Sequence, residues 1–248
     1  LLSQLAAEDE ILYIQGSDEV QVTGLVYDTR AEITAGSAFV CIAGAVFDGH
    51  SYAETAVAAG ASVIVAEQEL SLPETVTVVQ VKDTRKALAY LSAAWFGHPA
   101  KELITIGITG TKGKTTTTYM VHHILESVGI KSGLVGTVEV NNGAEVIPAS
   151  HTTPESYLLQ KYFREMVDNG CKAVVMEVSS QALKLSRVGG IVFDYGVFTN
   201  LEPDHIGPNE HSDFADYASC KAKLFSQCKV GIFNKDDENA AVMQENCT

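Results

Sequence analysis

The sequence is poor in the features that mark secreted, membrane-spanning and disulfide-bonded proteins. Its 248 residues contain only 6 prolines, 1 tryptophan and 5 cysteines, and the cysteines are widely spread without a CxxC pair. Such usage indicates free thiols and not a disulfide framework. No apolar run approaches the roughly 18 residues of a membrane helix, and the first ten residues, LLSQLAAEDE, lack the basic n-region of a secretory signal. We therefore predict a cytoplasmic protein without a membrane partner.

Basic residues are also scarce. The chain has 17 Lys and Arg against 31 Asp and Glu, which gives a formal net charge of −14 at pH 7. This balance argues against nucleic acid and anionic membranes as partners. An anionic ligand must therefore meet positive charge that is supplied locally, by a phosphate-binding loop, by single basic residues or by a metal ion.

Strand-like apolar runs alternate with helix-like segments along the chain, which is typical of an α/β fold. The pattern breaks at HPAKEL (98–103), where we place a boundary between a small α/β domain, residues 1–98, and a P-loop-type, mostly parallel α/β domain, residues 99–248. Strands are predicted at 37–44, 62–67, 75–81, 103–110, 132–140, 172–180, 193–200 and 229–234. Helices are predicted at 50–61, 83–97, 114–128, 155–169 and 213–226. We expect the second sheet to be incomplete at its C-terminal end.

A phosphate-binding loop stands at the start of the second domain, in GITGTKGKTTTTYM (107–120). The tail is that of a Walker A motif, but Ile108 replaces its first glycine, so the match is to the variant GxxGTxGKT. In such loops the backbone N–H groups and a helix N-terminus surround the phosphates, Lys114 reaches the β and γ oxygens, and the Thr115 hydroxyl binds Mg²⁺. The residues of this predicted nucleotide site are Gly110, Thr111, Lys112, Gly113, Lys114, Thr115 and Thr116. The alternative is a glycine-rich turn without a ligand.

Two further residues are candidate metal ligands. Glu177 ends AVVMEV, an otherwise apolar strand, where a charge is costly unless it lies at the C-terminal tip at which α/β sites open. We favour a ligand of the metal or of its water, with a helix-capping acid as the alternative. His205 follows the strand YGVFTN beside Asp204, which indicates a second metal site, although single histidines are more often structural.

A lysine is aimed inward on the helix 213–226. At 100° per residue, Lys221 lies within about 20° of Phe214 on the apolar face, whereas Lys223 points to the opposite side. A buried lysine extends its amine to solvent, pairs with an acid, or loses its proton and becomes reactive. A neutral amine can take up CO₂ to form a carbamate, which is an anionic metal ligand. Periodicity alone favours the ion-paired lysine.

A resemblance to a known family is carried by five stretches of the second domain: GITGTKGKTTT, HTTPE (151–155), MEVSSQAL (176–183), FTNLEPDH (198–205) and YASCKAKLF (217–225). In order and spacing they resemble the Mur ligases, the ATP-dependent amide-forming enzymes of peptidoglycan synthesis. The first domain resembles the uridine-nucleotide-binding domain of the MurE type through VYDTR (26–30) and GAVFDGHSYAETAVAAGA (44–61). The resemblance implies that ATP phosphorylates the D-Glu carboxylate of UDP-MurNAc-L-Ala-D-Glu, and that the amine of diaminopimelate or lysine attacks the acyl phosphate.

The resemblance also implies residue roles. Lys114, His205 and Lys221 are implied to be catalytic, with Lys221 carbamylated. The implied metal ligands are Thr115, Glu177, His205 and the Lys221 carbamate, with Mg²⁺ as the cofactor and ATP as the co-substrate. The implied substrate-binding residues are Asp28, Thr29, Arg30, His50, Thr152, Thr153, Ser179 and Arg187. We expect a monomer.

The sequence departs from the family pattern at two places. Gln181 stands where the family usually has histidine, so we give it no acid–base role, and His211 either replaces a later family histidine or lies on a surface loop. We expect the chain as given to lack the C-terminal ligase domain of the family, to bind the UDP substrate weakly and not to ligate. A MurF-type ligase that adds D-Ala-D-Ala, and a non-catalytic nucleotide-sugar-binding fragment, are the alternatives.

Overall fold

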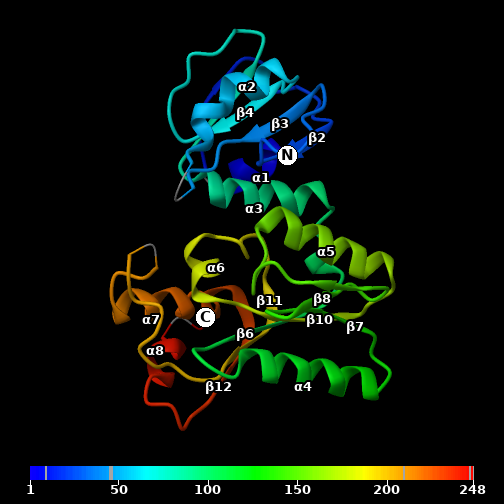
Figure 1. The fold of residues 1–248 in the computed structure, drawn as a ribbon, viewed down its shortest axis with the longest axis vertical. Helices are drawn as coiled ribbons and strands as arrows, with labels where there is room; N and C mark the ends of the chain where they lie inside the picture. Colours follow the sequence, from blue (N-terminus) through cyan, green and yellow to red (C-terminus); the bar gives the residue numbers. More distant parts are fainter. Residues whose placement is uncertain (9, 45–46, 209, 246, 248) are drawn as a thin grey trace. The chain divides into compact units, whose positions relative to one another are not determined.

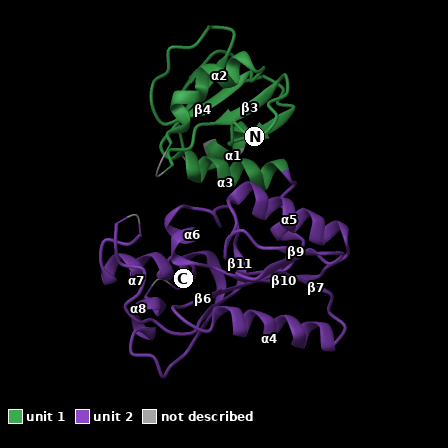
Figure 2. Ribbon diagram, viewed as in Figure 1, with its two compact units in different colours: residues 1–95 green, residues 96–248 purple. Residues whose placement is uncertain are grey.

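The computed structural model describes residues 1–8, 10–44, 47–208, 210–245 and 247. It divides into two compact units, Leu1–Trp95 and Phe96–Thr248 (Figures 1 and 2). Both contain a mainly parallel sheet with helices, so the predicted α/β class is confirmed. The assignment of the two domains to two ligands stays a prediction.

Unit 1 is built on a five-stranded sheet in the order β1-β5-β4-β3-β2. All neighbouring strands are parallel except the edge pair β1 and β5. The strands are β1 (Ile11–Gln15), β2 (Gly24–Val26), β3 (Ser37–Val40), β4 (Val63–Ala66) and β5 (Thr77–Val81). The helices are α1 (Leu2–Ala7), η1 (Gly49–Tyr52), α2 (Ala53–Ala58) and α3 (Thr84–Trp95). The apolar runs of β3 and β4 are buried along their whole length, as expected for parallel strands covered on both faces.

Unit 2 is built on a seven-stranded sheet in the order β12-β11-β6-β10-β7-β8-β9. The strands from β12 to β7 are parallel, and β8 and β9 continue the sheet antiparallel. The strands are β6 (Ile104–Thr109), β7 (Ser132–Val135), β8 (Glu139–Asn141), β9 (Val146–Pro148), β10 (Ala173–Glu177), β11 (Phe193–Phe198) and β12 (Cys228–Phe233). The helices are η2 (Pro99–Lys101), α4 (Lys114–Ser127), α5 (Ser156–Asp168), α6 (Ser180–Lys184), α7 (Phe214–Ala222), η3 (Phe225–Gln227) and α8 (Ala240–Gln244).

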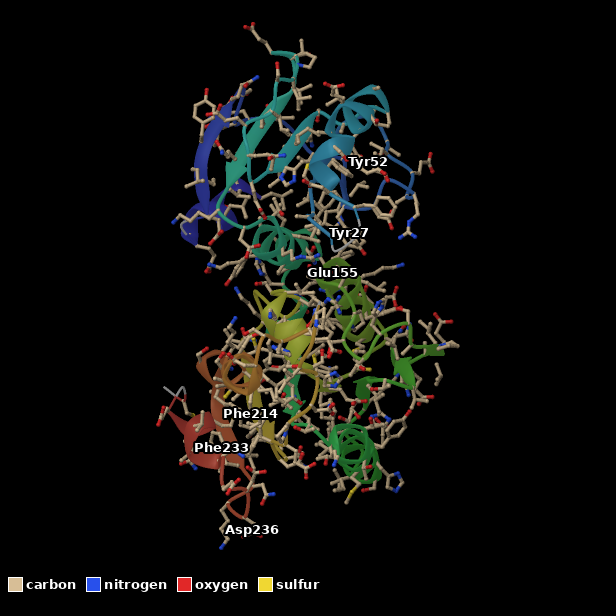
Figure 3. The ribbon with its side chains drawn as sticks, turned by 60° about the vertical axis from the view of Figure 1, so that its left-hand side comes forward. Tyr27, Tyr52, Glu155, Phe214, Phe233 and Asp236 are labelled. Atoms are coloured by element: carbon tan, nitrogen blue, oxygen red, sulfur yellow. The ribbon has the colours of Figure 1, made fainter. Side chains whose placement is uncertain are left out.

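Helices cover both faces of the unit 2 sheet. Figure 1 shows α4 and α5 on opposite faces, and α4 packs on β6, β7 and β10. The largest apolar core of this unit includes Phe163 of α5, Phe193 of β11 and Tyr217 of α7, with Phe214 and Phe233 packed against it (Figure 3). No helix within the described part of the chain has the length and apolar character needed to cross a membrane.

Three predicted elements of unit 2 differ from the structure. The strand expected at 132–140 is broken at Gly136, so that β8 runs antiparallel to β7. The strand expected at 172–180 stops at Glu177, because the Ser179 side chain accepts a hydrogen bond from the Ala182 N–H and caps helix α6. The helix expected at 213–226 ends as α7 at Ala222 and continues as a short 3₁₀ turn.

Candidate active site at the carboxyl ends of three strands

The predicted site residues of unit 2 gather at one edge of its sheet. Strands β11, β6 and β10 are neighbours and parallel, so their carboxyl ends lie side by side. The loop after β6, residues 110–113, leads into α4 and is called the P-loop here. Glu177 ends β10, and the residues up to His205 follow β11. Ligands of open α/β sheets bind at this edge.

The conformation of the P-loop requires glycine at two positions. Gly110 has φ +150°, and a Cβ atom there would lie 1.9 Å from Thr199 Oγ1. Gly113 has φ +81° and is the N-cap of α4, and it offers no side chain to the N–H groups of the first turn. Those N–H groups are therefore available to an anion at the positive end of the helix dipole.

The carbonyl oxygens of the P-loop hold the Lys114 amine. Lys114 Nζ donates to Gly110 O at 2.8 Å and to Thr111 O at 3.0 Å. Burial lowers the pKa of Lys114, an effect that the charge of Glu177 opposes. Lys112 is exposed and pairs with Glu202, and Thr116 is exposed on the first turn of α4. The lysine thus lies at the loop but is folded back onto it.

The buried carboxylate of Glu177 lies against Thr115. Glu177 Oε2 accepts from Thr115 Oγ1 at 2.9 Å, and Oε1 accepts from the Thr137 N–H at 2.8 Å. The Thr137 hydroxyl adds a contact of 3.2 Å to Oε2. Mg²⁺ prefers oxygen ligands of this kind. A hydroxyl and a carboxylate in contact beside a P-loop therefore fit a magnesium ion. The contacts of Glu177 do not have the geometry of a helix cap, which was the alternative interpretation.

Lys221 is buried on α7, with 1% of its surface exposed, whereas Lys223 is exposed. The predicted orientation of both lysines is therefore correct. Lys221 Nζ donates to Gly110 O at 2.8 Å and lies 4.6 Å from the centre of the Tyr217 ring. Burial, together with the nearby charge of Lys114, lowers the pKa of Lys221 to about 7. Among the described residues no carboxylate forms an ion pair with this amine, so the ion-paired interpretation is wrong.

The two histidines of the loop after β11 have different surroundings. His205 is half exposed, has φ +53°, and its Nδ1 lies 3.3 Å from Glu210 Oε1. His211 is 1% exposed, with Nε2 at 2.9 Å from Ser180 Oγ and Nδ1 at 3.3 Å from Asp216 Oδ2. Burial lowers the pKa of His211, and the charge of Asp216 opposes this. His211 is therefore a buried residue, and the surface-loop alternative is wrong.

A second group of potential metal ligands surrounds His211. Its ring, the Asp216 carboxylate and Cys220 Sγ lie within 4.8 Å of one another. However, Lys184 Nζ already lies 2.8 Å from Asp216 Oδ2, and it holds the pKa of that carboxyl well below its usual range. We assign no metal to this group, because an ammonium already balances its only carboxylate.

The predicted substrate-binding residues of unit 2 adjoin Glu177. Thr153 Oγ1 donates to Glu177 O at 2.9 Å and accepts from the Ser179 N–H at 3.1 Å. Arg187 Nη1 donates to Thr153 O at 3.1 Å, and Arg187 Nε lies 3.4 Å from the carboxylate of Glu155, which is labelled in Figure 3. Thr152 Oγ1 lies 3.0 Å from the hydroxyl of Thr137. The structure thus brings these residues together, and their contact with a substrate stays a prediction.

The predicted substrate-binding residues of unit 1 lie in two turns. Asp28 and Arg30 form an ion pair of 2.6 Å next to the exposed Thr29. His50 is buried, with Nδ1 at 2.6 Å from Asp48 Oδ1, and its Nε2 accepts from the Glu67 N–H at 3.0 Å. Nε2 therefore fastens η1 to the end of β4, while Nδ1 holds the N-cap residue of η1 itself. Of the segment 44–61, residues 45 and 46 lie outside the described residues.

Two residues of the site were missed in the sequence. Thr137 donates both its N–H and its hydroxyl to Glu177, but it stands inside a segment expected to be strand. Tyr217 is in contact with the P-loop through its hydroxyl, which lies 3.1 Å from Thr111 Oγ1. The signal for Tyr217 was a hydroxyl on the apolar face of a helix, where a phenol requires a polar partner.

The fold and the site together define an α/β protein of the P-loop class, in which a P-loop, a buried carboxylate and a buried lysine meet at the ends of parallel strands. A family model of the Mur ligase middle domain matches residues 108–248, and one described as the Mur ligase family catalytic domain matches residues 21–96. The chain therefore belongs to the Mur ligase family.

Individual relatives agree with this membership. The chain is 44% identical over 228 residues to a UDP-N-acetylmuramoyl-L-alanyl-D-glutamate--2,6-diaminopimelate ligase of Clostridium perfringens, covering 92% of this chain and 46% of the relative. It is 45% identical over 228 residues to the ligase of the same name from Bacillus licheniformis, with the same two shares. The chain thus spans about half the length of the curated relatives it matches.

Solved structures show the same fold. A structure of a UDP-N-acetylmuramoyl-L-alanyl-D-glutamate--2,6-diaminopimelate ligase superposes with a TM-score of 0.76 at 26% identity, covering 93% of this chain and 47% of that one. MurF from Acinetobacter baumannii gives a TM-score of 0.63 at 20% identity, covering 99% of this chain and 50% of that one. The second likeness concerns the fold alone.

Proposed function

We propose that this chain is part of an ATP-dependent ligase that joins 2,6-diaminopimelate to UDP-MurNAc-L-Ala-D-Glu in peptidoglycan synthesis. The observation that carries the proposal is the meeting of Lys114, Thr115, Glu177 and Lys221 around the P-loop. The printed names of the relatives supply the substrates. The proposed ligase acts in the cytoplasm as a monomer, and the net charge of −14 on the 248 residues of this chain disfavours nucleic acid or an anionic membrane as a partner.

The proposed reaction has two steps. The D-Glu carboxylate attacks the γ-phosphorus of ATP, which forms an acyl phosphate and releases ADP. The amine of the amino acid then attacks the acyl carbon, loses a proton and expels phosphate, so that an amide bond remains. Catalysis of this kind depends on positioning and on stabilising the developing negative charge.

The residues of the P-loop would bind and orient ATP. The N–H groups at the start of α4 would donate to the phosphates, and the Lys114 amine would leave the carbonyl oxygens of Gly110 and Thr111 for the same phosphates. Its positive charge would offset the charge that develops on the transferred phosphoryl group.

A magnesium ion would be held by Thr115 and Glu177, the pair that lies in contact in the structure. Such an ion, when bound, neutralises negative charge on phosphate oxygens. We propose His205 and a carbamate on Lys221 as further ligands. The lowered pKa of Lys221 supports the carbamate, because only the neutral amine takes up CO₂.

The proposal is tested by phosphate release in a protein that carries this sequence at the length of its relatives. ATP, Mg²⁺ and UDP-MurNAc-L-Ala-D-Glu are supplied with either diaminopimelate or L-lysine, and Lys114→Ala is the control. Release that depends on diaminopimelate supports the proposal, and dependence on lysine corrects the amino acid. Turnover only with a muramoyl-tripeptide and D-Ala-D-Ala would assign a MurF-type activity. ATP binding without any release would indicate a non-catalytic binding protein.

A further inference from the structure

Tyr217 is a fully buried residue of α7 that contacts four parts of the candidate site. Its hydroxyl lies 3.1 Å from Thr111 Oγ1 in the P-loop, and Lys221 Nζ lies 4.6 Å from the centre of its ring. The ring centres of His211 and His205 lie 5.2 Å and 6.1 Å from that of Tyr217. None of the roles proposed above involves this side chain.

The geometry admits either hydroxyl as the donor between Tyr217 and Thr111, and we assign the proton to Tyr217 from the other partners of Thr111. Thr111 Oγ1 donates its only proton to Glu202 O at 3.2 Å and accepts from the Glu202 N–H at 2.9 Å. A threonine hydroxyl has one proton and two lone pairs, so its remaining lone pair accepts from Tyr217. The phenol thereby fixes Thr111, whose N–H also donates to Asn200 O at 2.8 Å.

Helix α7 contacts two consecutive residues of the P-loop, Gly110 and Thr111. Tyr217 and Lys221 are four residues apart and therefore lie on the same face of the helix. Tyr217 binds Thr111, and Lys221 donates to Gly110 O at 2.8 Å while it lies over the Tyr217 ring. These contacts set the position of the Lys221 side chain relative to the loop.

We propose that Tyr217 is a positioning residue that holds the P-loop, through its hydroxyl, in the conformation that receives ATP. It touches no reacting atom and acts through Thr111 and the adjoining backbone. The inference rests on the proposed function, because the benefit of a fixed loop is the placement of phosphates. Displacements of about 1 Å in such sites cost large factors in rate.

The variant Tyr217→Phe isolates the hydroxyl, because the ring and its contacts with Lys221 and the two histidines remain. Tyr195→Phe is the matched control, since Tyr195 is exposed on β11, outside the P-loop contacts described here. In the 248-residue chain without nucleotide, we expect Tyr217→Phe to increase amide hydrogen exchange in residues 110–113. Exchange there equal to that of the wild type would overturn the proposal.

Nucleotide binding supplies the second readout. By calorimetry with ATP and Mg²⁺, we expect Tyr217→Phe to weaken binding roughly three- to tenfold, the effect of one lost hydrogen bond. In the protein at the length of its relatives, the KM for ATP should rise by the same factor, while the KM for UDP-MurNAc-L-Ala-D-Glu stays unchanged.

The outcomes separate a positioning role from a structural one. A lower melting temperature with unchanged ATP affinity would mean that the hydroxyl contributes to stability only, which overturns the inference. A wild-type protein that binds no ATP would overturn the proposed function and, with it, this inference. An active wild type with a Tyr217→Phe variant of equal KM for ATP would overturn the inference alone.

Discussion

The amine of Lys221 has surroundings that favour its neutral form. It is buried, it lies near the charge of Lys114, and it donates a hydrogen bond to a carbonyl oxygen, that of Gly110. With a pKa of about 7, a large share of the amine is neutral at slightly alkaline pH. That share is lost as the pH falls below 7, and the capacity to bind CO₂ is lost with it.

This protonation behaviour predicts a dependence on CO₂. In the protein at the length of its relatives, removal of CO₂ from the buffer should lower ligase activity, and bicarbonate should restore it. Lys221→Arg introduces a permanent cation that cannot form a carbamate, and it should lower ligase activity roughly 100-fold, the upper end of the cost of a lost outer-shell partner of a metal site. Lys223→Arg is the control, since Lys223 is exposed two residues away. Full activity without CO₂ would contradict the carbamate.

The burial of His211 predicts a pH effect on stability. Because its folded-state pKa lies below the usual 6.5, the unfolded chain binds more protons as the pH falls through 6.5, and stability falls with it. His98 and His122 also have lowered pKa values, so their contributions have the same sign. We expect urea midpoints to decrease from pH 7 to pH 5.5, and the decrease to be smaller in His211→Asn. An equal decrease in that variant would contradict the assignment to His211.

Residues whose environment follows from periodicity were predicted correctly. Lys221 was placed inward by the helical repeat, and Glu177 was placed at a strand tip because a charge interrupts an apolar run. His211, Thr137 and Tyr217 could not be assigned in this way. Their partners, such as Ser180 for His211 and Thr111 for Tyr217, are distant in sequence and are brought near only by the packing of loops.

At the level of elements, the junction of β6, P-loop and α4 depends on Gly110. Alanine there meets Thr199 Oγ1 and must also adopt a strained φ, so Gly110→Ala should cost roughly 1–3 kcal/mol of stability and abolish ATP binding. Gly129→Ala is the control, because Gly129 also has a positive φ, at the far end of α4, but has no atom within 4 Å of the added Cβ. Urea unfolding and calorimetry measure both effects. Retained ATP binding in Gly110→Ala would contradict a P-loop held in this conformation.

The predictability of each element followed its length and burial. Strands such as β10 and β11 and helices such as α5 carry long apolar patterns and were located to within a few residues. The strands β2, β8 and β9 have three residues each, and a run of three is too short to show a period. The edge strand β1 exposes Leu12 and Tyr13 and so lacks the pattern of a buried strand.

At the scale of the whole molecule, the positive charge at the candidate site is small for the ligands proposed. Among the described residues, Lys114 brings a positive charge to the P-loop, Lys221 favours its neutral form, Lys112 is paired with Glu202, and the chain carries a net charge of −14. ATP and the UDP-linked substrate are both strongly anionic. So few lysines cannot neutralise the negative charge of these ligands. Binding of the ligands by this chain should therefore depend strongly on Mg²⁺.

The charge at the candidate site and the length of the chain, which spans about half of its relatives, limit what the 248 residues can do alone. We expect the 248-residue chain to bind ATP weakly in the presence of Mg²⁺ and to form no amide with UDP-MurNAc-L-Ala-D-Glu and diaminopimelate. Mass spectrometry of the product, with the protein at the length of its relatives as the positive control, measures this. Amide formation by the 248 residues alone would show that the groups around the P-loop suffice for both steps of the reaction.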